Sequence, residues 1–359
     1  MAPMMSHARG LPYGDRVADS DLPGLALGAV TAWLSARGLV DGPVDATLVA
    51  GGRSNLTYVL SSSAGPLVLR RPPLGHVLAT AHDMAREHRV LSALHGTAVP
   101  VPRPLALCAD ADVTGAPFYV MSYAEGLVVR GPADAAALPA QGRVAVVAAM
   151  MATLAALHAV DPSAVGLGDF GRPSGFLERQ VRRWGAQLDA SHVRDLPGVD
   201  TLRSRLAATV PSSSGAAIVH GDYRLDNLVV GPPGAPDEYA VRAVLDWEMA
   251  TLGDPLADLG LLVAYWEGLG RLPASAVAAL GPAAGFPGGD ALVAQYTAAS
   301  GRDVAALPWY VAFGFFKIAV ILEGIHYRYV HGQTVGAGFD RIGDLVPHLV
   351  TLGNAALPA

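Results

Sequence analysis

Eight residues near the middle of the chain, residues 220–227 with the sequence HGDYRLDN, constrain the fold more than any other feature. Asp222 is followed five positions later by Asn227, and apolar runs suited to short strands flank the loop on both sides. A further carboxylate, Asp246, ends another apolar run at residues 241–245. The sequence therefore predicts short strands and a loop that hold two carboxylates and one amide close together.

Carboxylate and amide groups in this order suit the transfer of a phosphoryl group to a hydroxyl. The reaction needs a carboxylate that orients the hydroxyl and accepts its proton, and we assign this role of catalytic base to Asp222. It also needs oxygen ligands for Mg²⁺, which binds one or two carboxylates together with phosphate oxygens, and we assign Asn227 and Asp246 to this role. A lone aspartate more often caps a turn, but two motifs in this order favour the catalytic interpretation.

Apolar patterning divides the chain into a strand-rich N-terminal part and a helical remainder. The strand-rich part also contains one predicted helix, at residues 79–95. The predicted strands lie at residues 46–50, 56–61, 67–71, 105–108 and 118–122. The later predicted helices lie at residues 138–160, 174–188, 255–267, 290–299 and 308–329. Three strands, a helix and two more strands is the order of a protein kinase small lobe.

We therefore predict an α+β fold that is protein kinase-like and has two lobes. An N-terminal segment with a helix occupies residues 1–43. A small lobe with an antiparallel sheet, at residues 44–123, binds the nucleotide, and a hinge near its end joins the lobes. A mainly helical large lobe, at residues 124–359, carries catalysis and the substrate.

The charge and composition of the chain exclude several classes of protein. A net charge of −6 gives no electrostatic reason to expect nucleic acid or an anionic membrane as a partner. The single cysteine, Cys108, excludes an internal disulfide, and the single lysine, Lys317, is not followed by the serine or threonine of a Walker A loop. The apolar residues 144–157 and 309–322 are predicted to be buried helices, and the N-terminus lacks a signal-peptide pattern, so we expect a cytoplasmic protein.

The two motifs, HGDYRLDN and LDWEMATLGDPLADLG, resemble those of the aminoglycoside-phosphotransferase/choline-kinase superfamily. More narrowly, they resemble the kinase-like domain fused to some acyl-CoA dehydrogenases and its free-standing bacterial relatives. The segments GGRSNLTYVL, VLRRPP, AHDMAREHRVL, VPVPRPL and FYVMSYAEG agree, so the resemblance covers residues 44–262. It implies a kinase that uses Mg²⁺ with ATP or GTP, with Asp222 as base and Asn227 and Asp246 as metal ligands. It also implies that His220 packs beneath the loop and that Asp258 is a buried carboxylate holding it, while Glu248 lines the site.

The predicted small lobe supplies the candidate nucleotide contacts. A turn at Gly51, Gly52, Ser54 and Asn55 lies between two strands, where backbone N–H groups can close over phosphates, although such a turn is often only a hairpin. Kinases place a lysine on the next strand, paired with a helix glutamate, to hold the phosphates.

Arg70 occupies the matching place on the strand of this chain, and Glu87 is its predicted partner. A guanidinium can bind phosphate, yet its presence leaves open a nucleotide-binding pseudokinase. Met121 and Tyr123 belong to the predicted hinge that contacts the base of the nucleotide.

The predicted acceptor face is basic and apolar. Enzymes that bind polycationic aminoglycosides need clustered carboxylates near the catalytic base. In this chain, residues 161–206 instead mix acidic residues with seven arginines. This composition favours an anionic or apolar alcohol, and the resemblance implies a hydroxyacyl-CoA or a hydroxy acid. The alternative acceptors are aminoglycosides, other antibiotics and amino alcohols. The predicted partners are thus a nucleotide and a small hydroxyl compound, without nucleic acid or membrane, and the sequence leaves the oligomeric state open.

Overall fold

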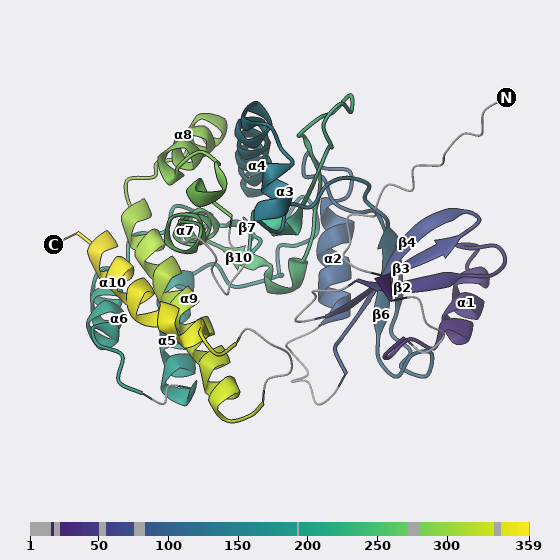
Figure 1. The fold of residues 1–359 in the computed structure, drawn as a ribbon, viewed down its shortest axis with the longest axis horizontal. Coiled ribbons are helices and arrows are strands. Elements are labelled where there is room, and N and C mark those ends of the chain that lie inside the picture. The colour runs from purple at the N-terminus through teal and green to yellow at the C-terminus, as the bar shows by residue number, and fades with distance from the viewer. Residues whose placement is uncertain are drawn as a thin grey trace.

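The smaller of two lobes is built on an antiparallel sheet of six strands in the order β1-β2-β3-β4-β6-β5 (Figure 1). The computed structural model describes residues 16–17, 22–49, 55–74, 83–191, 194–271, 280–333 and 339–358. The strands are β1 (Arg16–Val17), β2 (Asp45–Val49), β3 (Leu56–Ser62), β4 (Gly65–Arg71), β5 (Pro104–Cys108) and β6 (Phe118–Ser122). Five of them match the predicted strands to within a residue or two at each end. The two-residue strand β1, which pairs with β2, was not predicted.

Alternating side chains send the two faces of this sheet into two different cores, as the period of two in a strand requires. Leu69 on β4 packs in one cluster with Val30 and Leu34 of α1 (Leu27–Ser35). Its neighbour Val68 packs in the other, with Val90 of α2 (Met84–Leu94). The predicted N-terminal helix therefore packs on the sheet. Asp83 caps α2 by accepting a hydrogen bond from the backbone N–H of Arg86 (3.0 Å).

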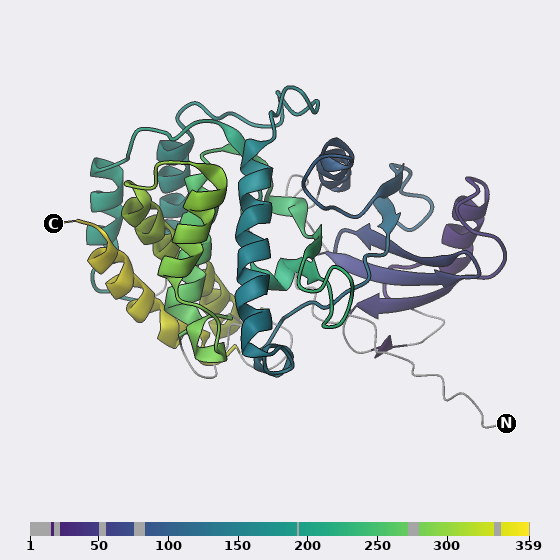
Figure 2. The same cartoon turned by 90° about the horizontal axis from the view of Figure 1, so that it is seen from above.

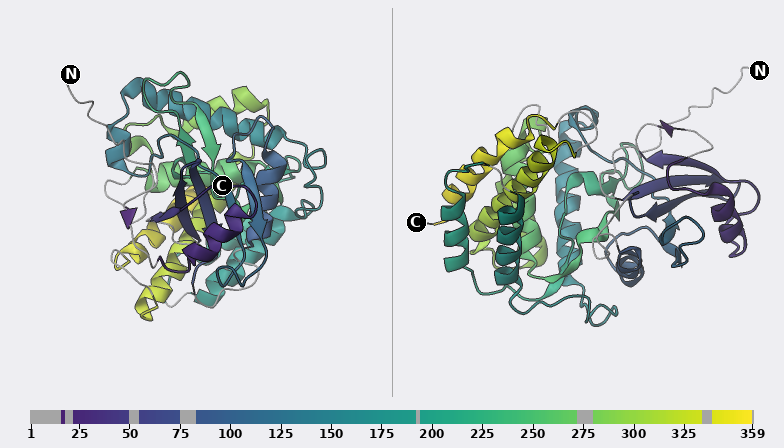
Figure 3. Two further views of the ribbon diagram at one scale, coloured as in Figure 1. Left: turned by 90° about the vertical axis from the view of Figure 1, so that its right-hand side faces the viewer. Right: turned by 90° about the horizontal axis from the view of Figure 1, so that it is seen from below.

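The larger lobe is mainly helical, as predicted. Its helices are α3 (Pro132–Ala136), α4 (Ala140–Ala159), α5 (Phe176–Ser191), α6 (Val199–Ala208), α7 (Leu256–Ala264), α8 (Gly289–Ser300), α9 (Leu307–Val330) and α10 (Val346–Ala356). Helices α3, α6 and α10 were not predicted, and α6 and α10 lie at the end of the molecule opposite the sheet (Figures 1 and 3). Figure 2 shows α4 upright on the side of the large lobe that faces the small lobe.

Two helices of the described chain have the length and apolarity of a membrane span. These are α4 and α9, and most of the apolar window of each is buried against the rest of the protein, 56% and 72% respectively. Both therefore pack as core helices of the large lobe, in agreement with the prediction.

Two small two-stranded sheets lie in the large lobe and frame the motifs. Strand β7 (Ala217–Val219) pairs with β10 (Thr251–Gly253), and β8 (Leu228–Val230) pairs with β9 (Val241–Val244). The loop at residues 220–227 connects β7 to β8, and Asp246 follows β9. The fold thus brings the two sequence motifs to neighbouring strand ends.

Candidate active site

The second residue of the loop between β7 and β8 is a glycine that no other residue can replace without strain. Gly221 has φ +84°, and a Cβ atom there would approach the backbone oxygen of Met249 to 2.7 Å. The carbonyl oxygen of Gly221 accepts a hydrogen bond from the Lys317 ammonium at 2.8 Å. Because Asp222 follows Gly221 directly, this tight turn fixes the backbone position of Asp222.

A buried carboxylate, Asp258 on α7, holds the start of the loop from below. Its two oxygens accept hydrogen bonds from the backbone N–H groups of His220 (2.6 Å) and Gly221 (2.8 Å). It also contacts the ring of His158 at 3.3 Å. Burial opposes ionisation of Asp258, but the hydrogen bonds from His158 and Gly221 hold its pKa below the ordinary value. The carboxylate thus fixes the backbone that carries Asp222.

The ring of His220 links this loop to the end of β9. Its Nε2 donates to the backbone oxygen of Leu245 (2.8 Å), and its Nδ1 accepts from the backbone N–H of Asp222 (3.2 Å), so the partners assign the neutral Nε2–H tautomer. The ring packs on Trp247, with 4.7 Å between ring centres. His220 therefore lies beneath the loop and holds the backbones of Asp222 and Leu245 together.

Asp222 and Asn227 are joined within the loop. The Asn227 amide donates to the backbone oxygen of Asp222 at 2.9 Å and lies 3.4 Å from its carboxylate. Burial raises the pKa of Asp222, which Arg224 and Lys317 oppose. A carboxylate with a raised pKa is a stronger base than an ordinary aspartate, which suits the removal of a hydroxyl proton.

Asp246 stands beside Asn227 because the backbone N–H of Leu245 donates to the backbone oxygen of Asn227 (2.8 Å). It adopts a left-handed conformation, with φ +66°, that costs a residue with a Cβ atom roughly 1 kcal/mol or more. Such strain is typical of functional sites. The indole of Trp247 donates to the backbone oxygen of Val244 (3.0 Å) and fixes this turn.

These two side chains fit a magnesium ion better than a transition metal. The described residues contain no group of three or more His, Cys, Asp or Glu side chains arranged to hold a metal. Asn227 uses its amide nitrogen in the loop, which leaves its oxygen on the other side of the amide, and the side chain of Asp246 is 31% exposed. One amide and one carboxylate oxygen, completed by phosphate oxygens, is a donor set that Mg²⁺ accepts.

Arg70 on β4 connects the small lobe to this site. Its guanidinium forms ion pairs with Glu87 of α2 (Nε to Oε2, 3.1 Å) and with Asp246, and lies 3.7 Å from Glu248. Burial raises the pKa of Glu87 to about 7, against the opposing effect of Arg70. The predicted pairing of Arg70 with Glu87 is therefore present, and the same cation also faces the carboxylate that we assign to the metal.

Asn55 and Tyr119 complete this network. The Asn55 amide donates to Glu87 (2.9 Å) and to Glu248 (3.0 Å), and the Tyr119 hydroxyl donates to Glu87 (3.0 Å). Sequence reasoning placed Asn55 in a phosphate-binding turn, whereas the structure shows its side chain bridging the carboxylates of the two lobes. Sequence reasoning did not identify Tyr119 as a site residue, because only the pairing of β6 with β4 brings this residue next to Arg70.

Arg71 points away from the site, as strand alternation requires. Its guanidinium donates to the backbone oxygens of Thr114 (2.7 Å) and Gly24, and its Nε donates to that of Pro72 (3.2 Å). Arg71 therefore ties neighbouring loops to β4, and only Arg70 faces the lobe interface.

The remaining predicted nucleotide contacts are placed only in part. Gly51, Gly52 and Ser54 lie outside the described residues. Met121 is buried within β6 and pairs with Val68, and Tyr123 follows directly after the strand. The connection between the lobes thus begins at Tyr123.

A sequence model of the phosphotransferase enzyme family matches residues 45–303, which include strands β2 to β6 of the small lobe, the loop and Asp246. The chain belongs to this family. Mouse acyl-CoA dehydrogenase family member 10 is 35% identical over 319 residues, which cover 87% of this chain and 29% of the mouse protein. The chain spans less than two-fifths of the length of the curated relatives that it matches.

This chain is also similar to solved structures of the same fold. A protein from Ralstonia eutropha, named as a candidate aminoglycoside phosphotransferase, is 34% identical with a TM-score of 0.77, covering 92% of this chain and 97% of the other. Aminoglycoside phosphotransferase APH(4)-Ia, in a ternary complex with ADP and hygromycin B, is 16% identical with a TM-score of 0.58 and coverage of 91% and 96%. The second match shows the fold alone. The predicted protein kinase-like fold is therefore confirmed.

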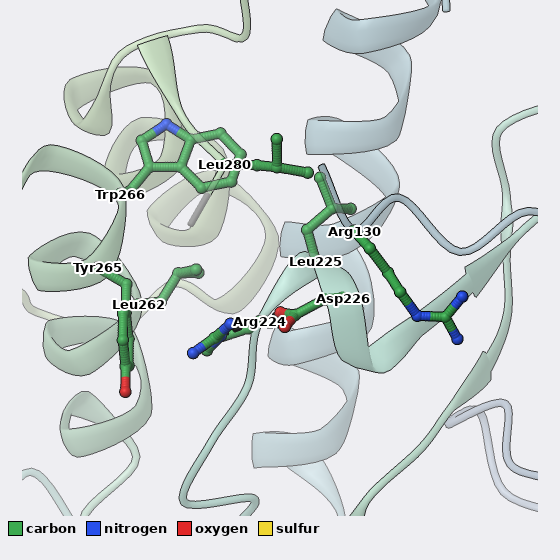
Figure 4. Close-up of a pocket in the computed structure, with 8 residues that line it drawn as sticks. All are labelled: Arg130, Arg224, Leu225, Asp226, Leu262, Tyr265, Trp266 and Leu280. Carbon is green, nitrogen blue, oxygen red and sulfur yellow. Dashed lines mark hydrogen bonds and ion pairs between the residues drawn. The ribbon is translucent and has the colours of Figure 1, made fainter. Parts of the chain in front are cut away.

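Two hollows flank the loop, and their sizes differ. Arg224, Asp226 and Tyr265 line the first, in which the guanidinium of Arg224 lies beside the carboxylate of Asp226 (Figure 4). Its volume is about 20 Å³, enough for a water molecule. The second has about 350 Å³ and is lined by Gly221, Lys317 and residues of α5 and α7. Of the two, only the second has a volume in the range of small-molecule binding sites.

Lys317 is a further site residue that sequence reasoning did not assign. The sequence carried a signal, because this single lysine interrupts an apolar helix. A charged group among apolar residues needs a partner. The structure identifies that partner as the carbonyl of Gly221.

We predict that Asp258→Asn lowers both stability and turnover. The change leaves a backbone N–H of the loop without its acceptor and removes a buried charge, which costs roughly 3 kcal/mol of unfolding free energy. Thermal melting measures the first effect and kcat measures the second.

Asp254→Asn is the matched control for this prediction. Asp254 is also buried, but its carboxylate binds Ser214 (2.6 Å) and Tyr310 (2.9 Å), away from the loop. We expect it to lower the melting temperature without lowering kcat in the folded protein. An equal loss of kcat in both variants would contradict a positioning role for Asp258.

Proposed function

We propose that this chain is an active kinase that transfers the γ-phosphoryl group of ATP or GTP to the hydroxyl of a small molecule. The observation that carries the proposal is the meeting of Asp222, Asn227 and Asp246 at neighbouring strand ends, opposite Arg70 of the small lobe. Membership of the phosphotransferase family supports it. So does the presence of ADP and hygromycin B in a structure that shares the fold.

Each residue then has one task. Asp222 accepts the hydroxyl proton while the hydroxyl oxygen forms a bond to the γ-phosphorus, and the bond from that phosphorus to the β-phosphate oxygen breaks. Arg70 holds phosphate oxygens and is itself oriented by Glu87. Asn227 and Asp246 would hold Mg²⁺, which supplies charge neutralisation for the phosphates when bound. Asp258 and His220 keep the loop backbone in place.

The acceptor we favour is a hydroxyacyl-CoA or a hydroxy acid. The name of the mouse relative, an acyl-CoA dehydrogenase family member, supports an acyl compound, and the basic residues of α5 support an anion. An aminoglycoside or amino alcohol is the alternative acceptor.

A nucleotide-binding pseudokinase is the alternative function. The ion pair of Arg70 with Asp246 favours it, because a metal and the phosphates must compete with that contact.

A nucleotide-consumption screen tests the proposal directly. The purified chain is incubated with Mg²⁺, ATP or GTP, and panels of hydroxyacyl-CoAs, hydroxy acids, amino alcohols and aminoglycosides. We expect turnover with at least one of the first two panels, and none when Mg²⁺ is omitted. Nucleotide binding without turnover on any panel would favour the pseudokinase, and turnover confined to aminoglycosides would overturn the choice of acceptor.

A further inference from the structure

Helix α2 of the small lobe is fastened to the large lobe by the side chain of Arg86. Its guanidinium donates to the backbone oxygen of Phe170 (2.7 Å) and to that of Ala250 (3.1 Å), and the guanidinium carbon lies 3.6 Å from the centre of the Phe170 ring. Phe170 belongs to the loop between α4 and α5, and Ala250 directly precedes β10. One side chain therefore joins three segments that are distant in the sequence.

The surroundings of Arg86 on its own helix are unfavourable for a cation. Arg86 is the third residue of α2, where the helix dipole repels positive charge. Burial lowers its pKa, Asp83 opposes this effect, and the charge of Arg89 adds to it. The position of the guanidinium therefore follows from its contacts with the large lobe, where the ring of Phe170 and two carbonyl oxygens match its planar shape and its several donors.

The backbone that Arg86 anchors also carries Glu87. The buried carboxylate of Glu87 is bound by the guanidinium of Arg70 (3.1 Å), the amide of Asn55 (2.9 Å) and the hydroxyl of Tyr119 (3.0 Å). Successive residues of an α-helix are turned by about 100°, so Arg86 can contact the large lobe while Glu87 contacts the sheet. A shift of the first turn of α2 would therefore move Glu87 relative to Arg70.

The same guanidinium holds the turn that follows Asp246. This turn is the 3₁₀ helix Trp247–Met249, which Asp246 precedes and Ala250 follows. The backbone N–H of Ala250 donates to the oxygen of Trp247 (3.0 Å), and the carbonyl oxygen of Ala250 accepts from Arg86. Arg86 is thus connected through one short turn to the carboxylate that we assign to Mg²⁺.

We infer that Arg86 is a positioning residue of the nucleotide site, which fixes Glu87 relative to Asp246 and thereby keeps Arg70 in place for the phosphates. The inference rests on the proposed function for the identity of the ligand, a nucleotide, but it does not require turnover. Arg86 acts through Glu87 on one side and through the turn at Ala250 on the other.

Arg89, one turn further along α2, offers a matched control. Its guanidinium donates to the backbone oxygen of Gly166 (2.8 Å) and pairs with Asp169, so it binds the same loop between α4 and α5. Its side chain is exposed, and its hydrogen bonds within the described part of the chain do not reach the turn after Asp246. Arg89→Met therefore removes a cation and a tether from the same helix without removing the contacts of Arg86.

Calorimetric titration of the full chain with nucleotide tests the inference. No acceptor is added, because Arg86 also lines the cavity of about 350 Å³. The probes are AMP-PNP and GMP-PNP, each with Mg²⁺ and with EDTA. We expect Arg86→Met to weaken nucleotide binding about 3–10-fold, the effect of about one net hydrogen bond, and Arg89→Met to weaken it by less than about twofold. Arg86→Lys keeps the charge and should recover part of the affinity.

A double-mutant cycle with Arg70→Ala separates positioning from a general loss of stability. Without Mg²⁺, Arg86→Met should no longer weaken nucleotide binding once Arg70 is removed, because Arg86 then acts only through Glu87 and Arg70. If Arg86→Met does not fold, Phe170→Leu takes its place in the cycle, since this change removes the ring beneath the guanidinium and keeps an apolar side chain.

Hydrogen exchange of the unliganded chain tests the contact of Arg86 with the turn. Backbone amides of residues 247–253 should exchange about threefold or more faster in Arg86→Met than in the unaltered chain, and should be unchanged in Arg89→Met. Equal exchange of this segment in the two variants would contradict the role of Arg86 at the turn, and with it the inference.

Three binding results would also overturn the inference. These are unchanged nucleotide binding in Arg86→Met, an equal loss in Arg89→Met, and an undiminished effect of Arg86→Met in the Arg70→Ala background. No nucleotide binding by the unaltered chain would overturn the inference together with the proposed function. Nucleotide binding in the expected pattern without any turnover would contradict the proposed function alone and leave the inference standing.

Discussion

Asp222→Ala is expected to lower kcat by about 10²–10⁴-fold, because a positioned general base contributes rate enhancement of that order. The variant should fold normally, since the loop is held by backbone contacts to Asp258 and His220 rather than by the carboxylate of Asp222. Steady-state kinetics with the acceptor found by the screen measures the loss, and thermal melting checks the fold.

The pH profile gives a second test of the same residue. Burial raises the pKa of Asp222, and the base works only when ionised, so kcat should fall as the pH is lowered through this raised value. The pH at which kcat falls to half should therefore lie above the pKa of an ordinary aspartate, which is about 3.9. It should disappear from the residual activity of Asp222→Ala.

Asp237→Ala serves as the control for Asp222→Ala. Asp237 is an exposed aspartate paired with Arg242 at the far end of β8 and β9, so its removal should leave kcat unchanged. Retained activity in Asp222→Ala would place the base elsewhere.

Arg70→Ala is expected to raise the nucleotide KM about 10–100-fold. Arg70 is the cation that the small lobe presents to the site, and the loss of a charge-assisted contact to phosphate costs about 1.5–3 kcal/mol. Arg70→Lys supplies the residue usual in kinases and should recover most of the affinity. A melting curve is needed for each variant, because Glu87 and Asp246 lose their counter-charge.

Arg71→Ala should behave in the opposite way. Its guanidinium binds the backbone oxygens of Gly24 and Thr114, so we expect a loss of stability of about 2–3 kcal/mol with the nucleotide KM unchanged in the folded protein. The two adjacent arginines therefore separate a binding effect from a structural one. Equal effects of the two substitutions on KM, or nucleotide binding unchanged in both variants, would contradict the assignment of Arg70 to the phosphates. Either result would strengthen the pseudokinase alternative.

Local patterns in the sequence predicted most of the fold. Short apolar runs predicted β2 to β6, and helical spacing predicted α4, α5, α7, α8 and α9. Helices α3, α6 and α10 were missed, as was β10, a strand of three residues. The strand β1 has only two residues, which is too short to show a strand pattern in the sequence.

Chain connectivity alone brings Asp222 and Asn227 together, because both belong to one loop of eight residues. Asp246 joins them only through the pairing of β8 with β9. Alternation along β4 also determined that Arg70 and Arg71 point to opposite faces. The packing of the two lobes brings Arg70 to Asp246, 176 positions away, and the packing of α9 beside the loop brings Lys317 to Gly221, 96 positions away. Local spacing carries no information about contacts between lobes or between a helix and a distant loop, since these depend on how the elements pack once they have formed.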